Sequence, residues 1–178
     1  ESVLPADELC GAFSEATGKG NNNPYLMHLV VRKGNDYFLY VYNAYSSSLA
    51  NDPLTLKTVI PIPAEVGHKA AVWFGAFSVR YGFYAIGNRI MKFDYLNITQ
   101  FAPEEKPFRL YDDKYEIVDV FVLIAGTALS DKDDCTVVYL YDREKKTTTI
   151  DVYNTVTGED LHTYEDILPG RGVEFIKK

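Results

Sequence analysis

The sequence contains little cysteine, methionine or tryptophan: two, two and one of these residues occur among 178. Cys10 and Cys135 lie far apart and lack the spacing of a metal site. Either they pair in an oxidising compartment or they remain two free thiols, and the sequence leaves both readings open. His28, His68 and His162 are isolated from one another, so no metal site is predicted from the histidines either.

Positive charge is also scarce. Lysine and arginine total 18 against 25 aspartate and glutamate residues, which gives a formal net charge of −7. Nucleic-acid binding requires a basic surface, so no nucleic-acid partner is expected. No apolar run approaches the ~18 residues of a membrane helix, and the longest, 118–125, is interrupted by Asp119. The chain begins with Glu1 rather than Met, and we expect a signal peptide, an anchor or more protein upstream.

Aromatic residues, in contrast, are abundant, with 14 tyrosines and 10 phenylalanines. Such residues favour the pleated surfaces of β-sheets. From Tyr25 onward, runs with strand composition recur at regular spacing, whereas residues 1–24 are rich in turn-forming glycine and asparagine. We therefore expect an irregular N-terminal segment over 1–24, holding at most a short helix at 7–16 or a strand at 9–14. A β domain should follow over 25–178.

The clearest hairpin covers residues 82–95, where two strand-like runs flank Gly87 and Asn88. These two residues tolerate the positive φ angles of a two-residue hairpin turn. Similar hairpins are predicted on either side, at 26–32 with 37–45 and at 135–141 with 147–154. A strand at 55–62 contains Pro61 and is followed by Pro63, which favours an edge position, and residues 63–68 are expected to be a connection.

The returning strands of the three hairpins share a pattern. Each ends in an aromatic residue, Tyr42, Phe93 or Tyr153, followed by Asn or Asp, and these aromatics are 51 and 60 residues apart. This spacing is close to the period of ~40–50 residues that is typical of β-propeller blades. Two complete four-stranded units are predicted, at 70–79, 82–86, 89–95 and 107–111, and at 116–125, 135–141, 147–154 and 161–164.

These units predict an all-β, propeller-like fold with about three four-stranded antiparallel blades. Known propellers have ~4–8 blades, so we expect the chain to be the C-terminal part of a larger propeller. A last strand at 173–177 would close the ring on an N-terminal blade and hide the sheet edges. A β-sandwich built from similar strands is the alternative.

The run 82–95 (GFYAIGNRIMKFDY) resembles the "YAxGNKIYKFD" segment of the PKD-like family lipoproteins of Bacteroides and relatives. Residues 29–32 and 37–40 are similar to that family's paired strands before a Tyr-rich hairpin. Residues 162–164 and 172–177 resemble its closing "TYxGFGKVVDIIYK" pattern, with Gly170-Arg171-Gly172 in place of Gly-Phe-Gly. The resemblance covers most of residues 25–178.

The resemblance implies a lipid-anchored protein of the outer membrane, cell surface or periplasm, with its anchor outside this chain. It also implies a setting beside nutrient-uptake machinery. We therefore expect a non-enzymatic binding or assembly module, without a cofactor, whose partner is a glycan, a peptide or an outer-membrane protein. The alternatives are a glycoside hydrolase or lyase that uses paired carboxylates, and a structural scaffold for partner proteins.

No phosphate-binding loop, nucleophile elbow or dinucleotide motif occurs, so no catalytic residue is assigned and the binding residues stay unknown. The carboxylates weighed for catalysis, none of them marked by a motif, are Glu65, Asp94, Glu116 and Asp119. Asp94 and Asn154 follow strands, where such side chains commonly form turns with their own backbone.

Two further groups of residues are candidate ligand sites. Asp131, Asp133 and Asp134 alternate as in a calcium loop, but the glycine and glutamate that an EF-hand requires are missing, so a solvated loop is expected. The flat aromatics weighed as sugar-stacking residues are Trp73, Tyr81, Tyr95 and Tyr111. Packing in the core is the more common role of such side chains.

Overall fold

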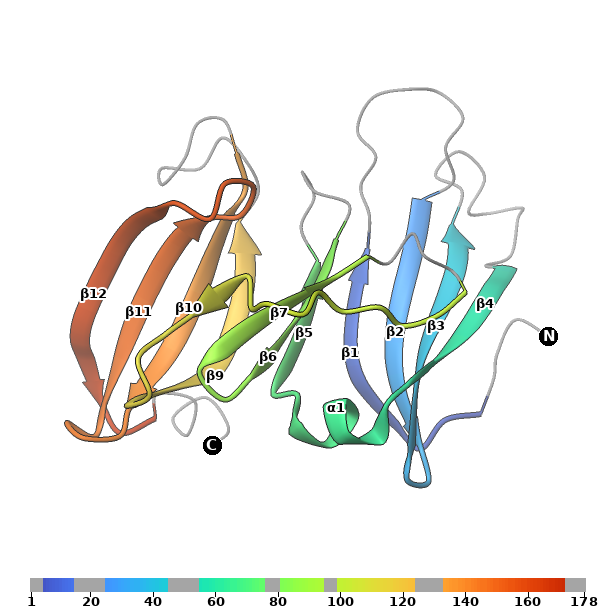
Figure 1. Cartoon of the computed structure of the whole chain (residues 1–178), viewed down its shortest axis with the longest axis horizontal. Coiled ribbons are helices and arrows are strands. Elements are labelled where there is room, and N and C mark those ends of the chain that lie inside the picture. The colour runs from blue at the N-terminus through green and yellow to red at the C-terminus, as the bar shows by residue number, and fades with distance from the viewer. Residues whose placement is uncertain are drawn as a thin grey trace.

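The computed structural model describes residues 5–14, 25–44, 55–75, 81–94, 99–123 and 133–171. Within these ranges the chain is all-β apart from one short helix, and its strands form three four-stranded antiparallel sheets (Figure 1). Sheet A contains β1 to β4, sheet B contains β5 to β8 and sheet C contains β9 to β12, each in sequential order. The predicted grouping of strands in fours is therefore confirmed.

The strands and the helix occur along the chain in the following order. Sheet A consists of β1 (Glu8–Ser14), β2 (Tyr25–Lys33), β3 (Asp36–Ala44) and β4 (Thr55–Ile62), after which comes helix α1 (Ala64–Lys69). Sheet B consists of β5 (Val72–Gly75), β6 (Gly82–Ile86), β7 (Arg89–Phe93) and β8 (Arg109–Leu110). Sheet C consists of β9 (Tyr115–Leu123), β10 (Cys135–Asp142), β11 (Thr147–Asn154) and β12 (Asp160–Pro169).

The hairpin turns form where glycine and asparagine predict them. Gly87, with φ of +59°, and Asn88 join the paired residues Ile86 and Arg89 of β6 and β7. Gly34, with φ of +62°, occupies the corresponding place between β2 and β3. Glycine adopts this left-handed backbone without steric cost, which explains why both tight turns occur at these positions.

Several predicted boundaries require correction. Residues 8–14, expected to be irregular or helical, form β1 and pair with β2 from Glu8↔Arg32 onward, so the strand alternative is correct there. The predicted strand at 70–79 is shorter within the described residues, where β5 covers Val72–Gly75, and 76–80 lie outside them. The outermost strand of sheet C extends to Pro169 instead of residue 164. The strand predicted at 173–177 also lies outside the described residues.

The connection predicted at 63–68 is instead helix α1. Glu65 lies in its first turn and Lys69 in its last, where their charges complement the helix dipole, and the Lys69 Nζ and Glu65 Oε1 atoms are 2.9 Å apart. Gly67 packs so closely on the Tyr37 ring that a Cβ atom would lie 2.2 Å from it. The helix therefore closes the end of sheet A by a contact that only glycine permits.

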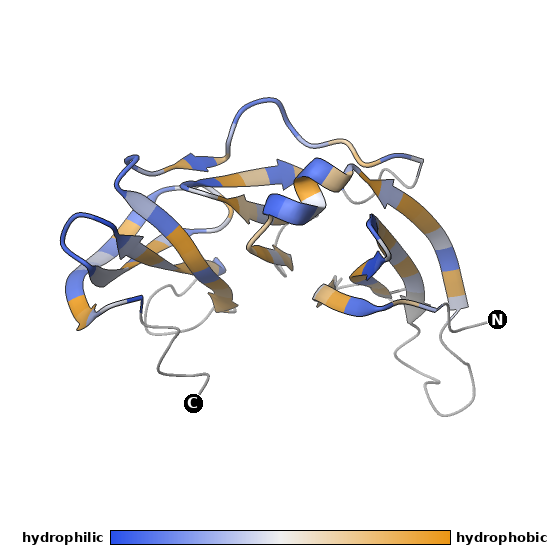
Figure 2. Ribbon diagram, turned by 90° about the horizontal axis from the view of Figure 1, so that it is seen from below, coloured by the Kyte–Doolittle hydropathy of each residue, from blue (hydrophilic) through white to orange (hydrophobic). Residues whose placement is uncertain are grey.

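Sheet B lies between the other two sheets, and the first strands β1, β5 and β9 are neighbours (Figures 1 and 2). Because successive side chains of a strand point to opposite faces, sheet B packs on both sides. Trp73, Tyr84 and Phe93 join a core cluster with sheet A, while Phe74, Phe83, Ala85 and Ile90 join a second cluster with sheet C. The sheets thus form a row, A–B–C, rather than two layers face to face.

Candidate functional site

The four candidate catalytic carboxylates are spread over three parts of the chain: α1, the residue after β7, and β9, which carries both Glu116 and Asp119. Glu65 is on α1 and bonds Lys69, and Asp94 is exposed beyond the end of β7. Glu116 receives two bonds from the Arg171 guanidinium, at 2.6 and 3.0 Å. Asp119 is exposed on the same strand, and its Oδ1 accepts the Val120 amide at 2.8 Å. No contact among the described residues brings two of these four carboxylates together.

The three histidines are also separate. His28 is fully buried and stacks on Phe13, with ring centroids 4.8 Å apart. Burial, with a smaller effect of Lys57, lowers the pKa of His28 to about 4. His68 Nδ1 lies 3.1 Å from the Tyr37 hydroxyl, and His162 is exposed on β12. Within the described ranges, no three metal-binding side chains cluster.

The suspected calcium loop is partly described, since Asp131 lies outside the described residues. Asp133 accepts a bond from the Asn154 amide group at 3.0 Å, and the buried Asp134 accepts the Thr155 amide through its main-chain oxygen at 2.9 Å. Asn154 Oδ1 in turn accepts the amides of Val156 and Thr157, so its predicted turn-forming role is confirmed. The corresponding role of Asp94 remains a prediction.

The structure describes three of the four aromatic residues that are candidates for sugar stacking. Trp73 is buried in the cluster between sheets A and B, and Tyr111 bonds Asp151. Tyr81 is half-buried, and the Lys92 ammonium lies 3.8 Å from its ring centroid. Tyr95 lies outside the described residues. Trp73 and Tyr111 therefore serve packing and internal bonding, while Tyr81 is half-buried beside Lys92.

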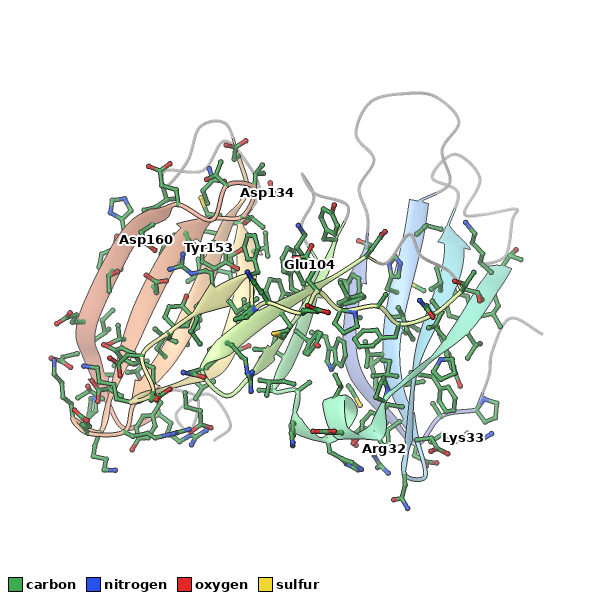
Figure 3. All side chains as sticks on the ribbon, in the orientation of Figure 1. Arg32, Lys33, Glu104, Asp134, Tyr153 and Asp160 are labelled. Carbon is green, nitrogen blue, oxygen red and sulfur yellow. The ribbon has the colours of Figure 1, made fainter. Side chains whose placement is uncertain are left out.

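The densest polar cluster was not predicted, and it joins sheet B to sheet C. Arg109 on β8 donates to Asp151 Oδ2 of β11 at 2.9 Å, to Asp160 Oδ1 of β12 at 2.5 Å and to the Gly158 carbonyl at 2.9 Å. Tyr111 donates to the same Asp151 oxygen at 2.7 Å. Figure 3 labels Asp160 and Tyr153, which both lie on sheet C.

Further contacts complete the cluster. The Thr163 hydroxyl donates to the other Asp151 oxygen at 3.0 Å, and the Arg109 guanidinium lies 4.4 Å from the Tyr153 ring centroid. The Asp151 side chain is 6% exposed, whereas that of Asp160 is 75% exposed. Arg109 therefore holds one buried and one exposed carboxylate at the same time.

The surroundings of Arg109 and Tyr111 keep both groups protonated. Burial opposes the charge of Arg109, but Tyr111, Asp160 and Asp151 together raise the pKa of its guanidinium. Burial, and next the charge of Asp151, raise the pKa of Tyr111, which keeps its proton. Neither group exchanges protons near neutral pH, so the cluster is suited to holding two sheets in register and not to acid–base chemistry.

The sequence hints at only one of the two central residues of this cluster, Asp151. Asp151 is a charged residue on the face of β11 that carries Tyr153, and a carboxylate in such a place requires a partner. Arg109 stands 42 residues earlier in a two-residue strand. Nothing in the spacing connects the two residues, so the pair becomes visible only in the fold.

The comparisons with known proteins give no identity. No protein-family model matches the chain, and no curated protein matches it. Cys10 on β1 and Cys135 on β10 are not joined in a disulfide in this structure. The single helix among the described residues is too short to cross a membrane.

Proposed function

We propose that the chain is part of a β-propeller that acts by binding or assembly and not by catalysis. Its working place would be the bacterial cell surface or periplasm, in a lipid-anchored protein that captures glycans or peptides beside a nutrient-uptake system. The location and the ligand class rest on the resemblance to PKD-like family lipoproteins. The architecture rests on the arrangement of the three sheets.

The propeller arrangement is supported mainly by three aromatic residues that occupy equivalent positions in the three sheets. Tyr42, Phe93 and Tyr153 each lie near the end of the third strand of their sheet. Phe93 packs in the cluster toward sheet A, and Tyr153 packs in the cluster toward sheet B, so each contacts the preceding sheet. Sheets that repeat in this way, with their first strands adjacent, are typical of propeller blades.

The ion pairs of two carboxylates support a binding role over a catalytic one. Glu116 is ion-paired with Arg171, and Asp151 with Arg109. A glycosidase requires one carboxylic acid that can give up a proton and a second carboxylate ~5–10 Å away. Both carboxylates are already occupied by guanidinium groups of the same chain, which favours a structural use.

A binding assay with a parallel turnover assay tests this proposal. The chain is screened against immobilised bacterial and plant polysaccharides, and each ligand that binds is then incubated with the chain while new reducing ends are measured. We expect binding without product release, and binding that weakens in Tyr81→Ala but not in Leu110→Ala, whose side chain is 67% exposed on β8.

Two results would overturn the binding role. Release of product that is lost in Glu116→Gln or Asp119→Asn would show an enzyme. A lack of affinity for every polysaccharide on the array, together with co-purification of an outer-membrane protein, would show a scaffold.

A further inference from the structure

One aromatic side chain of the A–B junction comes from a coil and not from a strand. Phe101 belongs to the connection between β7 and β8, which Figure 1 draws as an irregular coil. Its ring packs on Trp73, Tyr84 and Phe93, with ring centroids 6.0, 5.8 and 5.1 Å away. We call these three residues, which stand on β5, β6 and β7, the ring cage. Phe101 therefore occupies a site that three neighbouring strands of sheet B supply.

The strands hold the rings of the cage in place without help from Phe101. Trp73 and Tyr84 are paired across β5 and β6, and their ring centroids are 5.0 Å apart. Phe93 lies opposite Gly82, where a Cβ atom would come within 2.2 Å of its ring, so the glycine makes room for it. The three cage residues are buried, whereas Phe101 is only partly buried. Phe101 is therefore the wall of this site that lies nearest to solvent.

The segment that carries Phe101 is lightly attached to β7. Pro103 forms an isolated bridge with Phe93, and the Glu104 amide donates to the Lys92 carbonyl at 2.8 Å. The side chains of Lys92 and Glu104 form an ion pair at 3.4 Å, in which the glutamate is 53% exposed. Exposed ion pairs of this kind contribute little stability. The ring of Phe101 is thus the main buried anchor among these contacts.

The attachment becomes firm at Phe108. Its amide donates to the Ile90 carbonyl at 2.8 Å, its ring packs on Phe83 with centroids 5.3 Å apart, and β8 follows directly. Arg109 then bonds sheet C. Segments with few buried contacts open locally at a low cost in free energy. Residues 101–107 can therefore lift as a unit that turns about Phe108.

We propose that residues 101–107 form a lid, and that Phe101 occupies the place of an aromatic side chain from a peptide ligand. When the lid lifts, the ring cage accepts that side chain instead. The inference rests on the proposed binding role, and it selects a peptide over a glycan as the ligand of this site. Phe101 itself shows what the cage accepts, because it places a phenyl ring among the three rings.

A sugar ring is less suited to the cage. The three rings belong to an apolar cluster between sheets A and B. The hydroxyl groups of a sugar lose free energy when they are buried without hydrogen-bond partners. A phenyl ring gains free energy from tilted and edge-to-face contacts, and Phe101 makes such contacts with interplanar angles of 63°, 45° and 50°.

The sequence contains a single tryptophan, Trp73, so tryptophan fluorescence reports on the cage. The chain is titrated with N-acetylphenylalaninamide, and separately with N-acetylalaninamide and with cellobiose. For the wild type we expect a saturable change in emission with the phenylalanine probe alone. Phe101→Ala should bind this probe at least about tenfold more tightly, because the closed lid no longer competes for the cage.

Two further variants and a second measurement sharpen the test. Phe121→Ala removes a 40% exposed ring on β9, outside the cage, and should keep the wild-type dissociation constant. Phe101→Leu is a milder change whose dissociation constant should lie between those of wild type and Phe101→Ala, and circular dichroism shows whether each variant folds. In the wild type, the Glu104 amide on the lid should exchange its hydrogen at least about tenfold faster than the Phe108 amide.

Several results would overturn the lid. A wild type that gives no response up to the solubility limit of the phenylalanine probe would do so. A response confined to Phe101→Ala would show a cavity made by the substitution, and a response to cellobiose alone would remove the peptide as ligand. Equal exchange of the two amides would contradict the hinge. Polysaccharide binding on the array without any response of Trp73 would leave the proposed function standing and overturn this inference alone.

Discussion

The two junctions between the sheets are built differently. At the A–B junction, aromatic rings meet: Phe93 lies within 5.1 to 6.2 Å, centroid to centroid, of Phe101, Trp73 and Phe13. At the B–C junction, an apolar cluster is joined by the Arg109 network, which reaches the buried Asp151. Among the described residues, the A–B junction is centred on aromatic packing, and the B–C junction adds directional bonds.

This difference has physical consequences. Aromatic packing contributes much free energy, because each ring buries a large apolar area. A buried ion pair contributes little net stability, yet it becomes costly to break once formed, because the remaining charge stays buried. We infer that the A–B junction supplies mainly stability, and that Arg109 mainly fixes the position of sheet C relative to β8.

Removal of the central ring of the A–B junction should have the largest effect. Phe93 is 1% exposed, and Phe93→Ala removes a large side chain from a packed core. We expect a loss of about 3–5 kcal/mol in the free energy of unfolding, measured by urea denaturation. Leu110→Ala on the same sheet is the exposed control and should change stability by less than about 0.5 kcal/mol. A loss below about 1 kcal/mol for Phe93→Ala would contradict the A–B packing.

At the B–C junction, the largest effect should come from Arg109→Met. This substitution leaves Asp151 buried with only Tyr111 and Thr163 as side-chain donors. We expect a loss of about 3 kcal/mol, measured by the same denaturation. An unchanged stability would mean that Asp151 is not held by Arg109.

Acid should act on the A–B junction through His28. The pKa of His28 is about 4 in the fold, against an ordinary value of about 6.5. The unfolded chain therefore binds the proton first, and this contribution to stability is complete above pH 6.5 and is lost as the pH falls toward 4. Between pH 7 and pH 4.5, wild type should lose about 2 kcal/mol more than His28→Leu. His162→Leu, at an exposed position, should follow wild type, and equal pH profiles for all three proteins would contradict the burial of His28.

The smallest effect should come from the exposed part of the Arg109 network. Asp160 bonds the same guanidinium as Asp151, but its side chain is 75% exposed. Asp160→Asn should therefore cost less than about 1 kcal/mol, and the loss should shrink further in 1 M salt. If Asp160→Asn lowered the free energy of unfolding as much as Arg109→Met, the two carboxylates would contribute equally despite their different exposure, which would contradict the account.

The sequence predicts the parts of this fold that have a local cause. Gly87 and Asn88 define a tight hairpin, and the recurring aromatics Tyr42, Phe93 and Tyr153 mark equivalent third strands. Helix α1 was missed because six residues carry too little periodicity to show a buried face. β12 was predicted too short because it continues past an irregularity near Asp166, whose φ is +52°.

The polar cluster could not be predicted in the same way. Arg109 and Asp151 meet only because β8 packs over sheet C, and a contact of that kind depends on the whole fold. The sequence identifies the candidate carboxylates by residue type, but it does not identify their partners. Glu116, for example, is held by Arg171, which lies 55 residues further along the chain.

A double-mutant cycle between Arg109 and Asp151 tests the stacking of the sheets most directly. The free energies of unfolding of wild type, Arg109→Met, Asp151→Leu and the double variant are compared at one pH and salt concentration. Because the two residues stand on different sheets, the account predicts a coupling energy of about 2 kcal/mol or more, with the double variant more stable than the sum of the single losses implies. Additive losses would mean that these residues do not meet, and that sheet C does not follow sheet B as described.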